Sequence, residues 1–151
     1  MENLNLPSYS FNIKIIEQRK YIFDFLRRKF VILTPEEWVR QNFLRYLVDE
    51  KNYSKTLIAV EKEFKLNSLS KRCDAIVYNR KGKPVLIVEC KAASVNINQS
   101  VFDQIVRYNM KLNVDFLIVT NGLTHYCCKI NYAKKSYSFL KEIPDFTKIA
   151  Q

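Results

Sequence analysis

The sequence has 151 residues, of which 48% are hydrophobic, and a formal net charge of +10 at pH 7. This length and composition suit one folded domain with its own core, and they exclude a disordered tail. The two glycines are too few for the phosphate loops of nucleotide-driven motors and dinucleotide-binding enzymes. No apolar run approaches the roughly 20 residues of a membrane helix, so we expect a cytoplasmic protein without a membrane partner.

The basic balance favours a polyanionic partner. Nucleic acid fits better than a membrane surface, because no basic amphipathic helix stands out. Simple solubility is the alternative explanation of the charge. The four cysteines lack metal-binding spacing and the one histidine, His125, lies in an expected strand, so we expect buried cysteines and a structural histidine.

The N-terminal region predicts a β-hairpin and then a helix. Residues 11–16 and 21–24 are expected strands joined by a polar turn. The basic cluster at residues 27–29 is either a phosphate contact or a solvated edge of the fold.

The helix is expected over residues 35–50, with Thr34 as N-cap and Glu37 closing a capping box. Glu36 and Arg40 are then four residues apart on one face of the helix. They form either a surface ion pair or, with Glu36 turned the other way, a carboxylate supplied to a metal site.

A strand at residues 57–66 precedes a hairpin whose arms are residues 72–78 and 84–91, with Lys81 and Gly82 as a two-residue loop closed by the pair Arg80 and Lys83. The expected register pairs Tyr78 with Val85, Ile76 with Ile87 and Asp74 with Glu89.

Alternation along the strands puts Asp74, Glu89 and Lys91 on one face and Cys90 on the other. Like charges directly opposed in a sheet are destabilising, so a fold that keeps them needs a nearby cation. That cation is Lys91 or a divalent metal, which could assist a phosphate displacement. The alternative is a structural ion bridge at the end of the sheet.

The C-terminal part predicts a helix at residues 99–112, where Gln104 and Tyr108 lie together on one flank. They either pack on the sheet or touch a substrate backbone. Strands follow at residues 116–120 and 123–130, joined by a type I′ turn at Asn121 and Gly122, and an aromatic strand at residues 137–140. Without a linker or repeat, one domain over residues 1–151 is expected, with its motif-bearing core at about 34–130.

This order of motifs resembles the PD-(D/E)xK nuclease superfamily, and more narrowly the N-terminal nuclease domain of type I restriction enzyme R subunits as a stand-alone chain. The resemblance rests on five segments with the sequences TPEEWVRQ (34–41), RCD (72–74), VECK (88–91), DQIVRY (103–108) and TNG (120–122).

The resemblance implies an α/β fold with a restriction-endonuclease-like mixed sheet flanked by helices, to which this chain adds an N-terminal β-hairpin. It implies cleavage of DNA phosphodiester bonds, as an endonuclease rather than an exonuclease, with Mg²⁺ that Mn²⁺ may replace. The implied metal ligands are Asp74, Glu89 and the Cys90 carbonyl, with Lys91 positioning the attacking water and Glu36 as an outer carboxylate. Nucleic acid would be contacted by Gln104, Tyr108, Arg40 and Arg72.

The chain departs from R subunits in lacking a helicase motor. Two functions therefore remain open at this point. The first is a metal-dependent nuclease of a restriction or defence system, working alone or with a helicase, translocase or other restriction subunit. The second is a nucleic-acid-binding module with little catalysis of its own.

Overall fold

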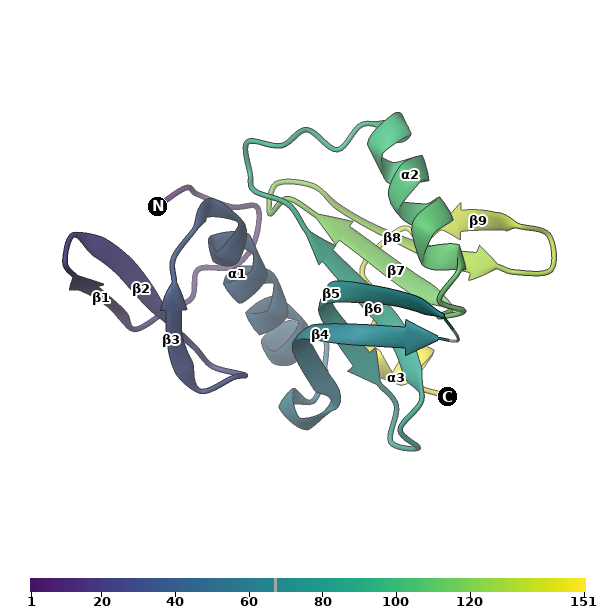
Figure 1. Cartoon of the computed structure of the whole chain (residues 1–151), viewed down its shortest axis with the longest axis horizontal. Helices are drawn as coiled ribbons and strands as arrows, with labels where there is room; N and C mark the ends of the chain where they lie inside the picture. The colour runs from purple at the N-terminus through teal and green to yellow at the C-terminus, as the bar shows by residue number, and fades with distance from the viewer. Residues whose placement is uncertain (67) are drawn as a thin grey trace.

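The computed structural model describes residues 1–66 and 68–151, with the side chains of residues 64, 66 and 69 left aside. It has a six-stranded sheet in the order β4-β5-β6-β7-β8-β9 and a separate three-stranded sheet β1-β2-β3 (Figure 1). The elements are β1 (Ile13–Ile16), β2 (Arg19–Asp24), β3 (Lys29–Ile32), α1 (Pro35–Glu50), a 3₁₀ turn (Lys55–Leu57), β4 (Ile58–Leu66), β5 (Leu69–Tyr78), β6 (Pro84–Cys90), α2 (Gln99–Met110), β7 (Phe116–Thr120), β8 (His125–Asn131), β9 (Ser136–Phe139) and α3 (Phe146–Ile149).

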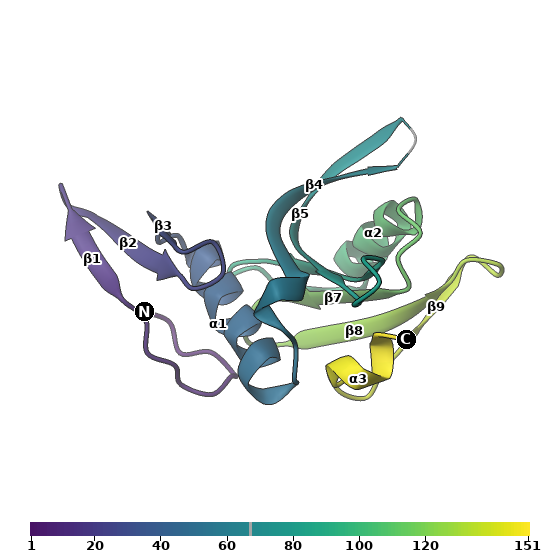
Figure 2. The ribbon, with the colours of Figure 1, turned by 90° about the horizontal axis from the view of Figure 1, so that it is seen from below.

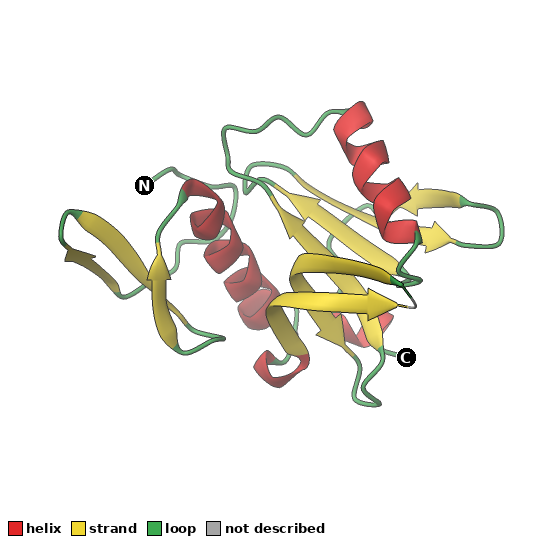
Figure 3. Ribbon diagram, viewed as in Figure 1, coloured by secondary structure: helices red, strands yellow, loops and turns green. Residues whose placement is uncertain are grey.

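The six-stranded sheet is mixed, because β6 and β7 run parallel while the other neighbours are antiparallel. Helix α1 packs on one face, where Phe43 and Leu47 share a cluster with Val88. Helix α2 packs on the other face, where Phe102 shares a cluster with Ile87. The expected mixed sheet flanked by helices is therefore confirmed (Figures 2 and 3).

The N-terminal hairpin is larger than expected, since residues 29–32 form a third strand antiparallel to β2. The β1–β2 loop is tight, with Glu17 and Gln18 at φ 48° and 68° between the paired residues Ile16 and Arg19. Two successive residues with positive φ are the geometry of a type I′ turn. The expected polar turn is therefore present, but its type was not predictable, because residues that tolerate positive φ are absent there.

The β5–β6 hairpin differs from the expected one at its turn. Asn79, not Arg80, closes the loop, as its N–H donates to the Lys83 carbonyl (2.8 Å) and Gly82 takes φ 81°. Tyr78 consequently pairs with Pro84 rather than with Val85, and a bulge follows.

The bulge restores the expected register by inserting one residue into β6. Beyond it Val77 pairs with Leu86, Ile76 with Ile87 and Ala75 with Val88. The predicted pairing of the residues nearest the expected site is therefore confirmed, although the predicted two-residue loop is wrong.

The β7–β8 connection is also longer than the expected two-residue turn. Strand pairing ends at Thr120 and His125, and Gly122 alone has positive φ in between. The side chain of Asn121 instead accepts hydrogen bonds from the N–H groups of Leu123 (3.0 Å) and Thr124 (2.9 Å).

The N-terminal segment is fastened to this loop. The Asn5 N–H donates to the Gly122 carbonyl (2.8 Å), and His125 Nε2 lies 2.9 Å from the Asn5 carbonyl oxygen. His125 Nδ1 lies 2.7 Å from Thr120 Oγ1, so both ring nitrogens have a partner. The imidazole thus holds the segment in place, as expected of a structural histidine.

All four cysteines are buried and unpaired. Among the helices that the structure describes, none is long and apolar enough to span a membrane.

Candidate functional site

The candidate site lies where β5 separates from β6. The ladder between the two strands ends at the pair Ala75 and Val88, and the next residues along the strands are Asp74 and Glu89. Since β5 no longer supplies a backbone partner there, the Cys90 N–H donates to Asp74 Oδ2 (2.8 Å). The carboxylate of Asp74 thus takes the place of a strand hydrogen bond.

Strand β5 changes its facing at this residue. Cys73 packs in the cluster under α2, whereas Ala75, two residues on, packs in the cluster under α1. Regular alternation would put both on one face. In the neighbouring strand Glu61 has φ 51°, so the two-stranded arm formed by β4 and β5 bends here and curves over α2 (Figure 2). Asp74 lies at the bend, within reach of both faces.

Arg40 holds Asp74 from the α1 side. Its Nη1 donates to Asp74 Oδ1 (3.0 Å), while Nη2 and Nε reach the two carboxylate oxygens of Glu37 (2.8 and 3.0 Å). The Arg40 side chain is only 6% exposed. The expected surface pair of Glu36 with Arg40 does not form, and this guanidinium is turned toward carboxylates instead of toward a nucleic-acid phosphate.

Glu37 explains why the capping box is only half formed. The Thr34 hydroxyl accepts from the Glu37 N–H (3.0 Å) as expected, but the Glu37 carboxylate does not return to Thr34. It binds Arg40, Gln41 Nε2 (3.0 Å) and Arg27 Nη2 (3.1 Å). The Glu37 carboxylate therefore belongs to an electrostatic network and not, as the sequence pattern predicted, to the helix cap.

Arg27 and Glu61 extend this network to the N-terminal sheet. Arg27 pairs with Asp24 (2.6 Å) and with Glu61 (3.1 Å), and Glu61 also pairs with Arg40 (3.0 Å) and Arg72 (3.1 Å). Partial burial acts to raise the pKa of Glu61, but the three arginines outweigh it and hold that pKa below its usual range. The ionic chain therefore runs continuously from Asp24 to Asp74.

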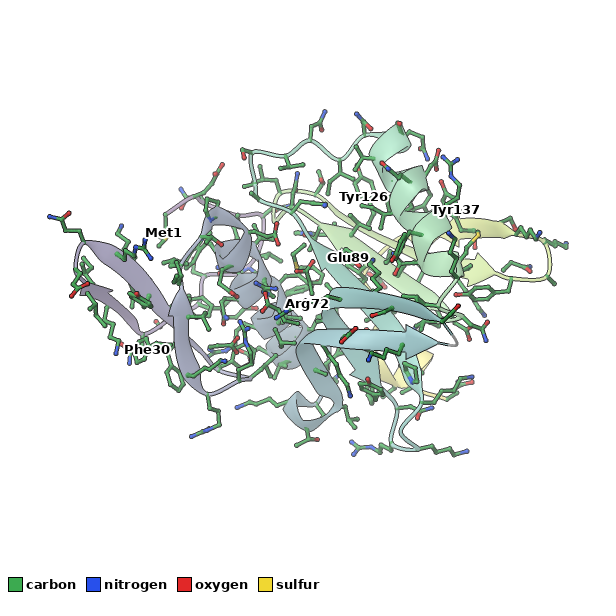
Figure 4. All side chains as sticks on the ribbon, in the orientation of Figure 1. Met1, Phe30, Arg72, Glu89, Tyr126 and Tyr137 are labelled. Carbon is green, nitrogen blue, oxygen red and sulfur yellow. The ribbon has the colours of Figure 1, made fainter. Side chains whose placement is uncertain are left out.

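Glu89 is held from the α2 side by Lys71, whose ammonium donates to Glu89 Oε1 and lies 3.4 Å from Asn109 Oδ1. Burial raises the pKa of the Glu89 carboxyl above its ordinary range, as does the negative charge of Asp74, while Lys71 acts in the opposite direction. Figure 4 labels Glu89 and the exposed Arg72 in this central region.

Glu36 and Lys91 complete the group. Burial and the charge of Asp74 raise the pKa of Glu36, against the opposing effects of Arg40 and Lys91. Lys91 is half-buried, its N–H donates to the Thr120 carbonyl (2.8 Å), and its ammonium forms no ion pair with any carboxylate that the structure describes.

One cleft borders carboxylates of the site, and a second cleft has no carboxylate in its lining. The first, of about 590 Å³, is lined by residues of the β2–β3 turn, β3, α1 and β4, including Arg27, Ile32, Glu36 and Glu61. The second, of about 570 Å³, lies on the exposed side of α2.

Gln104 and Tyr108 both line the second cleft, as their shared flank of the helix requires. Tyr108 is 38% exposed, and its hydroxyl reaches the Ser70 carbonyl at 3.4 Å. Lys71 Nζ lies 5.0 Å from the Tyr108 ring centre. The sheet thus separates both residues from Arg40, and Tyr108 approaches Glu89 through Lys71.

The described side chains contain no group of three or more candidate ligands preset around a metal position. Sequence reasoning also missed Arg27, Glu61 and Lys71, the residues that neutralise the carboxylates. Only the charge alternation around Glu61 and the basic cluster at 27–29 could have drawn attention to them.

Comparisons with known proteins agree with this geometry. Residues 35–144, most of the chain, match the family described as "Type I restriction enzyme R protein N terminus". A search of curated proteins found no match. A solved fragment of an HsdR subunit of a type I restriction enzyme from Vibrio vulnificus YJ016 superposes with a TM-score of 0.54 at 20% sequence identity.

That superposition covers 78% of this chain and 24% of the Vibrio chain, so the present chain spans about a quarter of its solved neighbour. At this identity the superposition shows a shared fold. The match to the family description over residues 35–144 carries the assignment further. The chain belongs to the family of type I restriction enzyme R protein N-terminal domains.

Proposed function

We propose that this domain is a Mg²⁺-dependent nuclease module of a restriction system, which hydrolyses DNA phosphodiester bonds and in which Mn²⁺ can replace Mg²⁺. The observation that carries the proposal is the register of the β5–β6 ladder, whose last pair, Ala75 with Val88, is followed on the two strands by Asp74 and Glu89. Opposed carboxylates cost stability unless a cation joins them. Two carboxylates and a carbonyl are the oxygen ligands that Mg²⁺ prefers.

Cys90 would supply the carbonyl. The N–H and C=O of one strand residue point to the same side, and the Cys90 N–H points to Asp74. The carbonyl of Cys90 is therefore directed to the side that β5 has left. When bound there with Asp74 and Glu89, the metal would stabilise negative charge on the scissile phosphate.

The remaining residues have roles that match their surroundings. Lys91, without a carboxylate partner among the described residues, can orient a water and offset charge on the phosphate. Glu36 is the outer carboxylate. Gln104, Tyr108 and the 70% exposed Arg72 can touch the DNA backbone, whereas Arg40 positions Asp74 from beneath.

The domain acts as an endonuclease on DNA, alone or recruited by a translocating motor or another restriction subunit. The family supports this, because R-subunit N-termini are its members.

A second candidate, a nucleic-acid-binding module without catalysis, is favoured by one observation. Arg40 already pairs with Asp74, and Lys71 already pairs with Glu89, so both carboxylates have a cation from the chain itself. In that case no metal is needed to keep the site folded.

Incubation with plasmid, linear duplex and single-stranded DNA, in Mg²⁺ or Mn²⁺ against EDTA, separates the two functions. Asp74→Asn and Lys91→Ala should each abolish metal-dependent cleavage and leave nucleic-acid affinity within about twofold. Asp49→Asn, an exposed carboxylate on α1, is the matched control and should cleave like wild type. Absence of cleavage by wild type under every condition, with intact binding, supports the binding module.

A further inference from the structure

The N-terminal sheet has an outer face that the proposed site does not use. This sheet precedes residue 35, where the family match begins. Directly paired residues of antiparallel strands point to the same side of a sheet. Ile22, which is completely buried, marks the inner face. The opposite face carries the paired residues Lys14, Tyr21 and Ile32, together with the pairs Phe23–Phe30 and Ile16–Arg19.

Three aromatic rings lie on this outer face, and none of them is fully buried. Phe23 and Phe30 contact edge to face with ring centres 5.2 Å apart. The Lys14 ammonium lies 3.9 Å from the centre of the Phe30 ring. The next strand position along the face adds Tyr21. Rings and a cation are thus presented together, at the left end of the molecule where Figure 4 labels Phe30.

The charge around these rings is strongly positive. Residues 13–32 contain six basic side chains, namely Lys14, Arg19, Lys20, Arg27, Arg28 and Lys29, and two acidic ones. Asp24 is buried and paired with Arg27, so at the surface Glu17 alone opposes the five remaining basic residues. This balance is complementary to a chain of phosphates.

The outer face also leads to the candidate site. Ile32, at its edge, lines the same 590 Å³ cleft as Glu36 and Glu61. Arg27, in the turn between β2 and β3, ties the sheet to Glu37 and Glu61. The ionic chain fixes the N-terminal sheet relative to the carboxylates of the candidate site. A polymer bound on the outer face is therefore directed toward that site.

We propose that the outer face of β1–β3 binds single-stranded DNA, with bases stacked on Tyr21, Phe23 and Phe30 and phosphates paired with Lys14 and Arg19. Stacking rings interleaved with basic residues is how proteins hold single strands without sequence preference. Duplex DNA keeps its bases stacked on one another, so it gains nothing from the rings. The inference rests on the proposed function for the identity of the polymer as DNA.

A competing occupant is a second copy of this chain. Ile16 and Ile32 of the outer face lie on the edge strands β1 and β3 and are exposed, and an exposed apolar edge can pair with another. The basic charge argues against it, since two like copies would bring their cations together.

The test compares affinities for a labelled oligothymidine strand and for a labelled duplex of equal length, in EDTA so that no cleavage is required. The double variant Tyr21→Leu, Phe30→Leu keeps apolar bulk and removes two rings. Its affinity for the single strand should fall at least tenfold, or about 1.4 kcal/mol, while its duplex affinity stays within twofold. Phe139→Leu, which removes a 49% exposed ring on β9, is the matched control and should bind both like wild type.

A second variant guards against misfolding of the first. Lys14→Gln, Arg19→Gln should reduce the slope of log affinity against log salt by about 1.4, the value for two contacts with a single strand. Lys134→Gln, Lys135→Gln, in the distant β8–β9 loop, should leave the slope unchanged.

Unchanged strand affinity in both variants overturns the inference, as does equal loss for strand and duplex. Sedimentation that shows a wild-type dimer dissociated by the ring variant also overturns it and assigns the face to a second copy. Because binding is read in EDTA, the result is independent of cleavage. If the wild type never cleaves DNA but the Tyr21→Leu, Phe30→Leu variant loses single-strand affinity, this inference stands and the proposed nuclease activity does not.

Discussion

Arg40→Met removes the guanidinium that holds the candidate site together while keeping most of the apolar stem. In the wild type this side chain is 6% exposed and pairs with Glu37, Glu61 and Asp74 at 2.8–3.0 Å. Breaking a buried ion pair from one side costs about 3–5 kcal/mol, since the other charge is left uncompensated.

Loss of the Arg40 guanidinium affects the three carboxylates unequally. Glu37 keeps Arg27 at 3.1 Å, and Glu61 is 32% exposed and keeps both Arg27 and Arg72. Asp74 keeps only the Cys90 N–H among the described hydrogen bonds. We therefore expect the lower part of the range, about 3 kcal/mol, with most of it arising at Asp74.

Urea unfolding of wild type and variant at neutral pH measures the free energy of unfolding. Arg45→Met is the matched control on the same helix, because Arg45 pairs with Asp49 at 3.1 Å in a largely exposed setting and should cost less than about 1 kcal/mol. The double variant Arg40→Met, Asp74→Asn should be less destabilised than the sum of the single ones by at least about 1 kcal/mol.

An Arg40→Met protein no less stable than Arg45→Met would refute the reasoning. So would strict additivity with Asp74→Asn, which would mean that Arg40 does not act through this carboxylate.

Four further outcomes are expected. Lys71→Met should lower unfolding stability by about 2 kcal/mol at pH 8 and by much less at pH 5, because the raised pKa of Glu89 lets it take up a proton in acid; the urea midpoints at both pH values measure this. Burial lowers the pKa of His125, so the folded state favours the neutral ring. The free energy of unfolding should therefore fall as the pH drops below the pKa of the unfolded-state histidine. This fall should be steeper in wild type than in His125→Gln. Gly82→Ala should cost about 1 kcal/mol, since φ is 81° but a Cβ would meet nothing within 4 Å. Gly122→Ala should lower the melting temperature further, because its Cβ would lie 2.7 Å from a neighbouring leucine methyl carbon.

The turns are where the structure differs from the prediction made from the sequence. Glycine dipeptides predicted two-residue loops at Gly82 and Gly122, yet both loops are longer. The tight turn instead forms at Glu17 and Gln18, which lack any such signal. Turn residues express a local conformational preference. The length of these loops also depends on bulges and side-chain caps, which are determined by distant parts of the chain.

The register that leads to Asp74 and Glu89 was predictable, because the bulge in β6 compensates for the longer turn. The bend at Asp74, where β5 breaks its alternation, was not predictable. The cations that hold the two carboxylates were not predictable either. Arg27, Arg40 and Lys71 come from a turn, a helix and an arm, and only the tertiary fold brings their long side chains to the carboxylates. The helical spacing of Glu36 and Arg40 permitted a pair, but deeper burial offered Arg40 three better partners.

The attachment of Asn5 to the β7–β8 loop sets an order of events during synthesis. The contact joins residues 120 positions apart, so the segment around Asn5 cannot dock until His125 has left the ribosome. At roughly 5–20 residues per second this is a delay of about 6–24 s. Through that interval the apolar and basic strands β1–β3 are already made but lack the loop that anchors the segment before them. In a nascent chain of this domain the cationic, aromatic strands are therefore made before the loop that anchors the segment preceding them.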